Sequence, residues 1–461
     1  MTLIKSISGI RGTIGGKPNN NLTPIDIVES TAAYGSWLIS NFKNEKVKVV
    51  IGRDARISGQ MVENLCIGTL QSLGIDVVNL GLSTTPTVEI AVPMEKAHGG
   101  IILTASHNPK EWNALKLLNN KGEFISAEDG QLLLDIIKGN DFNFCNVDNI
   151  GRVSEDQTYF TKHIEEILKI NKVDITAIKN ANLRVVVDAV NSTGGMVLPQ
   201  LLKILGCAEV IELYCNPTGE FPHNPEPLPE HLTELSKTVI QTKAHLGIVV
   251  DPDVDRLAFV CEDGSMFGEE YTLVAVADHV LKKEKGNTVS NLSSTRALRD
   301  VTESHGCKYN ASAVGEVNVV KLMKETNAII GGEGNGGIIF PELHYGRDAL
   351  IGIALFLTHF ANENKTMSEL KNSYPNYTIS KNKIQLTPDI DTDKILNTLA
   401  SKYKDHPQIN VDGLKIELGN EWVHLRKSNT EPIIRIYSES SSKSKAHELG
   451  NRFIDEINAL T

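Results

Sequence analysis

Short apolar runs alternate along the chain with longer stretches in which apolar residues recur every three to four positions. One order repeats in three segments: an apolar, β-branched run, a polar loop, a helix-spaced stretch, a glycine and a second short run. These segments span residues 48–81, 183–213 and 287–310. The short runs predict strands and the helix-spaced stretches predict helices. Such strand–helix–strand units pair in parallel, so we expect three similar α/β domains with mixed or mostly parallel sheets.

The C-terminal part of the chain has a different pattern. Its runs "LKIEL", "EWVHLR" and "IIRIYSES" alternate apolar and polar residues, and Gly419 and Asn420 form a turn signal between the first two. A helix-spaced stretch follows over residues 443–460. Alternating runs joined by short turns predict an antiparallel sheet with one face covered, here by the helix. We therefore expect a fourth domain of the α+β class.

The length of 461 residues is about three times that of a typical domain. From the changes of pattern we place domain boundaries at 1–150, 151–255, 256–375 and 376–461. A linker is expected near Asp255–Glu262.

The composition is that of an ordinary globular protein, with 41% hydrophobic and 22% charged residues. The formal net charge of −11 disfavours nucleic acids and anionic membrane surfaces as partners, but not small anionic ligands. The N-terminal residues lack the apolar core of a signal peptide, and no run is long enough to span a membrane. The six cysteines are scattered and form no CxxC pair, which argues against a zinc cluster and against a disulfide framework. We expect a cytoplasmic monomer or homodimer.

The stretch Ile102–Lys116, "ILTASHNPKEWNALK", starts as an apolar strand and then becomes polar. Ser106 and His107 stand together shortly before Pro109. Two interpretations are open from these residues alone. Ser106 is either a nucleophile, or part of the polar punctuation that ends a strand and begins the next element.

The stretch "LGIVVDPDVDRLAFV" places Asp251, Asp253 and Asp255 at alternate positions directly after an apolar run. Three neighbouring carboxylates repel one another, and such a cluster usually provides oxygen ligands for a hard divalent cation. The alternative is an acidic surface turn. Arg256, directly after the third aspartate, suits an anionic ligand beside the metal.

A calcium-binding EF-hand loop has the same acidic spacing, with Glu262 at its twelfth position. However, its sixth position requires a glycine and is Arg256 here. The flanking runs also predict strands rather than helices, so this interpretation is excluded.

A glycine-rich stretch, "GGEGNGGIIFPE", presents Glu333 and Asn335. It matches the G-x-G-x-x-G dinucleotide pattern literally, but Pro341 follows where that pattern needs a helix. A carboxylate and an amide on an exposed turn suit sugar hydroxyls, and a plain turn is the alternative.

The stretch "RKSNTEPIIR" combines two guanidinium groups with short hydrogen-bonding side chains, as a phosphate monoester requires. These residues are Arg426, Ser428, Asn429, Thr430 and Arg435. A hairpin with surface arginines is the alternative.

Together these loops resemble those of the α-D-phosphohexomutase superfamily over the whole chain. "TASHNP" is similar to its phosphoserine loop, "DPDVDR" to its magnesium loop, "GEGNGG" to its sugar-recognition loop and "RKSNTEPIIR" to its phosphate-binding loop. They occur in the family order, one in each expected domain. The N-terminal "GIRGTIG" also resembles the family's opening motif. The resemblance implies four domains around a central cleft.

The resemblance also implies roles for individual residues. Ser106 would be the phosphorylated nucleophile. A single Mg²⁺ would be bound by Ser106, Asp251, Asp253 and Asp255. Arg11 and Lys116 would be catalytic residues. The chemistry of the residues themselves adds His107, next to the serine, and Arg256, next to the aspartates, as further catalytic candidates. The substrate would be bound by Glu333, Asn335, Arg426, Ser428, Asn429, Thr430 and Arg435.

The implied reaction interconverts hexose 6-phosphates and 1-phosphates through a bound 1,6-bisphosphate. The runs "MTLIKSISGIRGTIGG" and "GGEGNGGIIFPELHYGRD" most resemble the phosphoglucosamine mutases, which act on glucosamine phosphates. Asn335 and Gly337 depart from the sugar loop of many bacterial members, so phosphomannomutase or phosphoglucomutase activity is the alternative. A sugar-phosphate phosphatase or a silent sensor would be a different class of protein.

Overall fold

The computed structural model describes residues 2–6, 9–385, 390–427 and 433–460. The chain forms two compact units, of which unit 1 contains Met1–Thr272 and Gly336–Ser368. Unit 2 contains Leu273–Asn335 and Glu369–Thr461. Among the described helices, none is long and apolar enough to cross a membrane.

The first sheet of unit 1 is mixed and has the strand order β1-β2-β6-β5-β3-β4-β7. In sequence order its strands are β1 (Ile4–Ser6), β2 (Gly9–Thr13), β3 (Lys48–Arg53), β4 (Asp76–Leu82), β5 (Gly99–Leu103), β6 (Trp112–Leu118) and β7 (Val153–Glu155). The pairs β5–β3, β3–β4 and β4–β7 are parallel. The pairs β1–β2, β2–β6 and β6–β5 are antiparallel.

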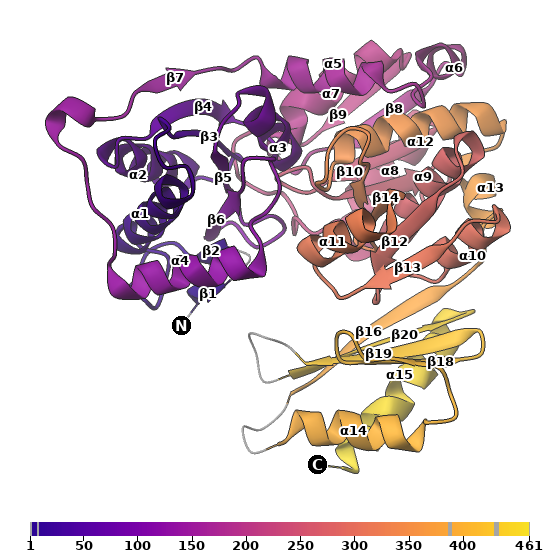
Figure 1. Ribbon diagram of the computed structural model, residues 1–461. Coiled ribbons are helices and arrows are strands. Elements are labelled where there is room, and N and C mark those ends of the chain that lie inside the picture. Colours follow the sequence, from indigo (N-terminus) through magenta and orange to yellow (C-terminus); the bar gives the residue numbers. More distant parts are fainter. Residues whose placement is uncertain (1, 7–8, 386–389, 428–432, 461) are drawn as a thin grey trace. The chain divides into compact units, whose positions relative to one another are not determined.

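Helices cover both faces of this sheet (Figure 1). These helices are α1 (Pro24–Asn41), α2 (Gly59–Ser72), α3 (Thr85–Met94), α4 (Ala127–Gly139) and α5 (Tyr159–Lys169). Val49 and Ile51 of β3 belong to the core formed with α1, α2 and α4. Val50 between them belongs to a second core, which includes Val88 of α3 and Tyr159 of α5. Because successive strand residues point to opposite faces, a continuous apolar run is what this doubly covered strand requires.

The second sheet of unit 1 has the order β11-β10-β8-β9, and only β11 is antiparallel to its neighbour. Its strands are β8 (Arg184–Asp188), β9 (Glu209–Leu213), β10 (Leu246–Val250) and β11 (Leu257–Cys261). The helices of this region are α6 (Ile175–Asn180), α7 (Gly194–Leu205), α8 (Thr233–Thr242) and α12 (Ala349–Glu363), and β15 (Gly337–Ile339) precedes α12. Short 3₁₀ turns occur at Val147–Asn149 and Pro229–His231.

The prediction of a linker near Asp255–Glu262 is wrong. This segment contains β11, whose five residues are all buried and pair with β10. Phe259 of β11 stacks on Phe356 of α12 with 3.8 Å between ring centroids. The aspartates therefore lie in a tight connection between two core strands rather than between domains.

Unit 2 contains two further sheets. In the first, β12 (Asn287–Asn291) pairs in parallel with both β13 (Tyr309–Ser312) and β14 (Ala328–Glu333). The helices along this part of the chain are α9 (Glu269–Lys283), α10 (Ala297–Ser304), α11 (Glu316–Thr326) and α13 (Met367–Asn372). α10 and α11 pack against the sheet.

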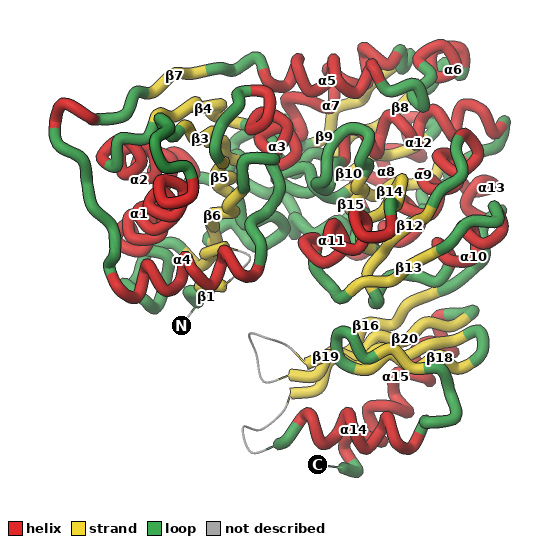
Figure 2. The backbone as a smooth tube through the Cα atoms, viewed as in Figure 1, coloured by secondary structure: helices red, strands yellow, loops and turns green. Residues whose placement is uncertain are grey.

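The other sheet of unit 2 is antiparallel, with the order β16-β20-β19-β18-β17. Its strands are β16 (Thr378–Gln385), β17 (Gln408–Ile409), β18 (Leu414–Leu418), β19 (Glu421–Lys427) and β20 (Ile433–Ser440). α14 (Thr392–Lys402) and α15 (Lys443–Asn458) pack against it (Figure 2).

The predicted architecture is confirmed. Residues 48–81 form β3, α2 and β4, residues 183–213 form β8, α7 and β9, and residues 287–310 hold β12, α10 and the start of β13. The C-terminal sheet is antiparallel as expected, and α15 occupies the predicted final helix.

Phe356→Ala should destabilise unit 1 by about 3–5 kcal/mol, because it leaves a cavity against Phe259 and Phe267 that the packed core cannot fill. Urea denaturation followed by circular dichroism measures this loss. Phe144→Ala is the matched control, since Phe144 is 52% exposed and its truncation should cost less than about 1 kcal/mol. Equal effects of the two changes would contradict the role assigned to the stack.

Candidate active site

The serine loop leaves β5 and is held by a buried arginine. Arg56 donates hydrogen bonds to four carbonyl oxygens of this loop, at 2.5–2.9 Å. These carbonyls belong to Ser106, Asn108, Pro109 and Trp112. Asp54 lies 3.1 Å from Arg56 Nε, which pairs the buried charge. Burial raises the pKa of Asp54, and Arg56 opposes that rise.

Ser106 has a strained backbone. Its φ of 49° lies in the left-handed region, which a residue with a Cβ adopts at a cost. The Ser106 N–H donates to Thr104 Oγ1 at 2.9 Å, and its carbonyl accepts from Arg56. Backbone strain retained by such contacts is concentrated at functional sites.

The loop between β10 and β11 buries all three aspartates. Asp251, Asp253 and Asp255 are 0% exposed, and their nearest carboxylate oxygens lie within 4.8 Å of one another. Val254 within the loop has φ 63°, an outlier for a β-branched residue. The turn therefore holds the carboxylates together against both charge repulsion and backbone strain.

This carboxylate cluster fits a divalent cation. Among the described residues, Oδ1 of Asp253 and Oδ1 of Asp255 are buried without a hydrogen-bond partner. Buried polar atoms are normally paired, so two unpaired carboxylate oxygens beside a third carboxylate are what a hard metal ion would complete.

The serine and aspartate loops meet directly. Ser106 Oγ donates a hydrogen bond of 2.7 Å to Asp251 Oδ2. Burial and the neighbouring Asp255 and Asp253 raise the pKa of Asp251 well above its usual value. The serine hydroxyl therefore lies at the edge of the carboxylate cluster.

Two cations bind the other side of the cluster. Lys116 Nζ lies 2.7 Å from Asp253 Oδ2 and 3.2 Å from Asp255 Oδ2. Arg347 Nη2 lies 2.7 Å from Asp255 Oδ2. Burial alone would raise the pKa of Asp255, but Arg347 and Lys116 hold it below its ordinary value. Burial alone would lower the pKa of Lys116, and the two aspartates raise it instead.

His107 and Arg256 border the same cluster. His107 Nδ1 is 3.3 Å from Ser106 Oγ. Burial and Arg256 lower the pKa of His107 to about 2, so its imidazole is neutral near pH 7. Arg256 Nε lies 4.0 Å from both Asp251 and Asp255, and Arg256 Nη1 lies 3.5 Å from Glu226.

Arg11 lies on β2 and is exposed. In the register of β2 with β6 it stands opposite Ala114, two residues from Lys116. Residues two apart on a strand share a face, so Arg11 and Lys116 belong to the same face of the first sheet. Unit 1 thus holds all the predicted catalytic and metal-binding residues.

The predicted substrate-binding residues lie in unit 2. Glu333 ends β14 and is 5% exposed, and Asn335 Nδ2 is 3.5 Å from Glu333 Oε2. Arg426 of β19 and Arg435 of β20 are direct cross-strand partners. Ser428, Asn429 and Thr430 lie outside the described residues.

Four contributors to the site were not predicted from the sequence: Arg56, Asp54, Thr85 and Arg347. A signal for three of them exists, because "GRDA" occurs at 52–55 and again at 346–349, and Arg56 directly follows the first copy. Thr85, at the start of α3, donates a hydrogen bond of 2.5 Å to Asp253 Oδ2, and nothing in its local sequence indicates this.

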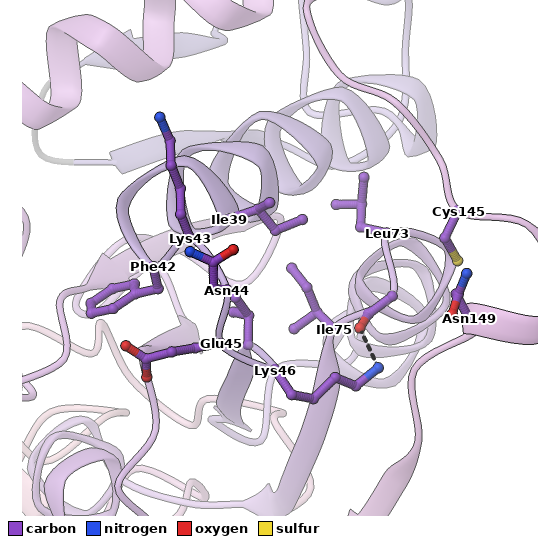
Figure 3. A pocket seen from close by; sticks show the side chains of 12 residues that line it. Ile39, Phe42, Lys43, Asn44, Glu45, Lys46, Leu73, Ile75, Cys145 and Asn149 are labelled. Carbon is purple, nitrogen blue, oxygen red and sulfur yellow. Dashed lines mark hydrogen bonds between the residues drawn. The ribbon is translucent and has the colours of Figure 1, made fainter.

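A surface pocket lies elsewhere in unit 1, at the end of α1 (Figure 3). Its lining includes Ile39, Phe42 and Cys145, and Lys46 Nζ donates to the Gly74 carbonyl at its edge. None of the predicted site residues lines this pocket.

Four family descriptions match successive parts of the chain, all headed phosphoglucomutase/phosphomannomutase. The alpha/beta/alpha domains I, II and III match residues 3–144, 159–264 and 268–377, and the C-terminal domain matches residues 389–456. The domain boundaries placed from the sequence stay predictions.

Relatives match over nearly the full length of the chain. A phosphoglucomutase/phosphomannomutase from Thermococcus kodakarensis is 35% identical over 452 residues, covering 96% of this chain and 98% of the relative. A probable phosphoglucosamine mutase from Methanopyrus kandleri is 34% identical, covering 98% and 96%. A crystal structure of a phosphoglucomutase/phosphomannomutase family protein from Burkholderia thailandensis has a TM-score of 0.86 and 26% identity, covering 99% of this chain and 97% of that one. The chain therefore belongs to the α-D-phosphohexomutase superfamily, whose members are isomerases that move a phosphoryl group within a hexose phosphate, and it most resembles the phosphoglucosamine mutases.

Proposed function

We propose that the chain interconverts glucosamine 6-phosphate and glucosamine 1-phosphate through a phosphorylated Ser106. The observation that carries this proposal is the serine hydroxyl, hydrogen-bonded at 2.7 Å to a buried carboxylate cluster with two unpaired oxygens. A serine that only ended a strand would need neither the cluster nor the strained backbone conformation.

In this proposal, phosphoserine transfers its phosphoryl group to the free hydroxyl of the bound sugar phosphate. The serine Oγ–P bond breaks as the sugar O–P bond forms, and the hydroxyl proton leaves to a base. The product is a 1,6-bisphosphate, which turns over and returns its other phosphoryl group to Ser106. The serine ends the cycle phosphorylated, so phosphate is conserved.

Ser106, Asp251, Asp253 and Asp255 would hold one Mg²⁺, which would act as a Lewis acid on the transferred phosphoryl group. The unpaired oxygens of Asp253 and Asp255 support this assignment.

The cations beside the cluster would neutralise the charge of the transferred group, which is the main demand of phosphoryl transfer. Arg256 and Arg11 supply fixed positive charge. Lys116 is our candidate for proton exchange during the transfer, as the proton donor, because Asp253 and Asp255 raise its pKa and keep its amino group protonated. His107, neutral and 3.3 Å from Ser106 Oγ, would orient the serine.

The residues of unit 2 would bind the rest of the substrate. Glu333 can accept hydrogen bonds from two sugar hydroxyls, and the 3- and 4-hydroxyls occupy similar places in both orientations of a turning substrate. Arg426 and Arg435 would bind the phosphate that is not transferred, together with Ser428, Asn429 and Thr430. Like charges directly opposite on a sheet are unfavourable, and a bound anion between them removes that cost.

The choice of amino sugar is supported by Asn335, whose neutral amide can accept a hydrogen bond from a 2-ammonium group without excluding a 2-hydroxyl. The name of the Methanopyrus kandleri relative agrees with this choice. The Thermococcus kodakarensis relative carries the name of the alternative, phosphoglucomutase/phosphomannomutase activity.

Comparative turnover tests the function and the sugar together. We expect kcat/KM to be highest for glucosamine 6-phosphate, with measurable glucose 6-phosphate turnover, in coupled assays of each 1-phosphate. A tenfold lead for mannose 6-phosphate, about 1.4 kcal/mol in transition-state binding, would establish the alternative. Release of inorganic phosphate as the main product would instead indicate a phosphatase.

Ser106→Ala should abolish the phosphoenzyme and reduce kcat by at least about a thousandfold, since the variant lacks the hydroxyl oxygen that would carry the transferred phosphoryl group. Intact-mass measurement should find one phosphate on the wild type and none on the variant. Ser58→Ala in the neighbouring loop is the control and should stay phosphorylated. An active Ser106→Ala enzyme would defeat the assignment.

Asp253→Asn should raise the magnesium concentration needed for half-maximal activity and lower kcat by about tenfold or more, the scale on which altered metal sites act. The change deletes ligand charge but keeps side-chain volume. KM for the sugar phosphate should change less than kcat. Asp263→Asn, in the turn after β11, is the control, and an identical magnesium titration for Asp253→Asn and wild type would show that Asp253 is not a ligand.

A further inference from the structure

Asp412 occupies the turn before β18 and contacts two functionally important segments of unit 2. Its Oδ2 accepts a hydrogen bond of 3.0 Å from the Val314 N–H. The same oxygen lies 2.9 Å from Arg426 Nε. One carboxylate oxygen therefore joins the segment before α11 to the arginine assigned to the phosphate.

The segment at Val314 also holds the sugar-binding glutamate. The next residue, Gly315, donates its N–H to Glu333 Oε1 at 3.2 Å. Asn291 Nδ2 donates to the same oxygen at 2.9 Å. The N–H that Asp412 accepts from and the N–H that Glu333 accepts from thus belong to neighbouring residues, Val314 and Gly315.

A second route connects the same two regions through His424. The ring Nε2 lies 2.6 Å from the Asp412 carbonyl oxygen, and Nδ1 lies 2.9 Å from Ser293 Oγ. Burial lowers the pKa of His424 to about 4, so the ring is neutral near pH 7 and carries a single N–H. Because a carbonyl can only accept, that N–H is on Nε2, and Ser293 donates to Nδ1.

This route ends at the sugar loop. Ser294, next to Ser293, accepts a hydrogen bond of 2.9 Å from the Gly334 N–H and donates to Asn291 Oδ1 at 3.0 Å. Hydrogen bonds and two covalent links between neighbouring residues thus form a closed ring. It runs from Asp412 through Val314 to Glu333 and returns through Ser294, Ser293 and His424.

The pair of Asp412 and Arg426 adds little to stability. Both side chains are 23% exposed, and partly exposed ion pairs contribute only modestly. Its effect is on position. The contact is an ion pair and not a hydrogen bond, since Arg426 Nε has no hydrogen-bond partner among the described residues, and the ion pair holds the guanidinium next to Asp412.

We propose that Asp412 is a positioning residue that fixes the spacing between the phosphate-binding Arg426 and the sugar-binding Glu333. The inference rests on the proposed function, in which one substrate uses both residues in two orientations. A fixed spacing allows either end of the sugar phosphate to bind with the same contacts.

Asp412→Asn is the first test, because asparagine keeps the size and an acceptor for the Val314 N–H but loses the charge that anchors Arg426. We expect KM for glucosamine 6-phosphate and glucose 6-phosphate to rise by the same factor, at least about fivefold, with kcat within twofold. In the Arg426→Ala background the same change should have less than a twofold effect, since coupled residues are not additive. Asp405→Asn, an exposed aspartate of unit 2, is the matched control.

A merely structural role gives a different result: kcat and KM would both worsen, to the same extent with or without Arg426. That outcome, or an unchanged KM in Asp412→Asn, overturns the proposal. Ser293→Ala tests the ring at a half-buried position should Asp412→Asn fold poorly, and it should raise KM by a smaller factor. If Asp412→Asn does not fold and Ser293→Ala has an unchanged KM, the proposal is also overturned.

Calorimetric binding of inorganic phosphate separates this proposal from the proposed function. Wild-type protein that binds phosphate but turns over no hexose phosphate would defeat the proposed function alone. Asp412→Asn should bind phosphate at least about fivefold more weakly than wild type, and equal binding by the two proteins defeats the role of Asp412. Wild-type protein that binds no phosphate defeats it as well.

Discussion

Unit 1 is organised around the electrostatic cost of burying three carboxylates in one turn of chain. An unpaired buried charge costs several kcal/mol, and the three repel one another as well. Lys116 from β6 and Arg347 from the segment before α12 reduce this cost, but they act mainly on Asp253 and Asp255. Asp251 faces the serine instead, and burial and its acidic neighbours raise its pKa. Lys116 and Arg347 therefore neutralise one side of the cluster, and Asp251 on the other side faces the Ser106 hydroxyl and, at 4.0 Å, Arg256.

The compensating groups come from distant parts of the chain, and this explains much of the local structure. Asp348 caps α12 by accepting from the Leu350 N–H at 2.8 Å, which fixes the start of the helix next to Arg347. The Val254 carbonyl accepts from the Ala349 N–H, so the strained aspartate turn is tied to the same helix. Left-handed conformations of non-glycine residues cost about 1–3 kcal/mol each, and they persist where surrounding contacts determine them. Ser106 and Val254 both meet that description.

The sequence predicted the elements well, because each α/β segment repeats a local pattern that survives in the fold. Residues 183–213, for example, contain β8, α7 and β9 in the expected order. The prediction of a linker near Asp255–Glu262 is wrong because the apolar run "LAFVC" inside this segment is a buried core strand. Ser106 and the aspartates could be singled out because their loops interrupt apolar strands. Arg56 acts through contacts more than fifty positions away, and only the repeated "GRDA" beside it marks it in the sequence. Asp412 could not be singled out, because it contacts Val314, nearly a hundred positions away.

The two units differ in the chemistry they can supply, and this bears on selectivity. Unit 1 holds charges suited to a phosphoryl group, which is the same in every hexose phosphate, so these charges do not distinguish the sugars. In the proposed function, selectivity would then arise among groups such as Glu333 and Asn335. Two protein donors to Oε1 fix the plane of the Glu333 carboxylate, and the Asn335 amide nitrogen lies 3.5 Å from Oε2. In the proposed function, the carbonyl oxygen of Asn335 would be the acceptor that meets a sugar substituent. An acceptor binds an ammonium group about twice as strongly as a hydroxyl, because the hydrogen bond is charge-assisted. In the proposed function, such an acceptor would favour an amino sugar while still tolerating a neutral one.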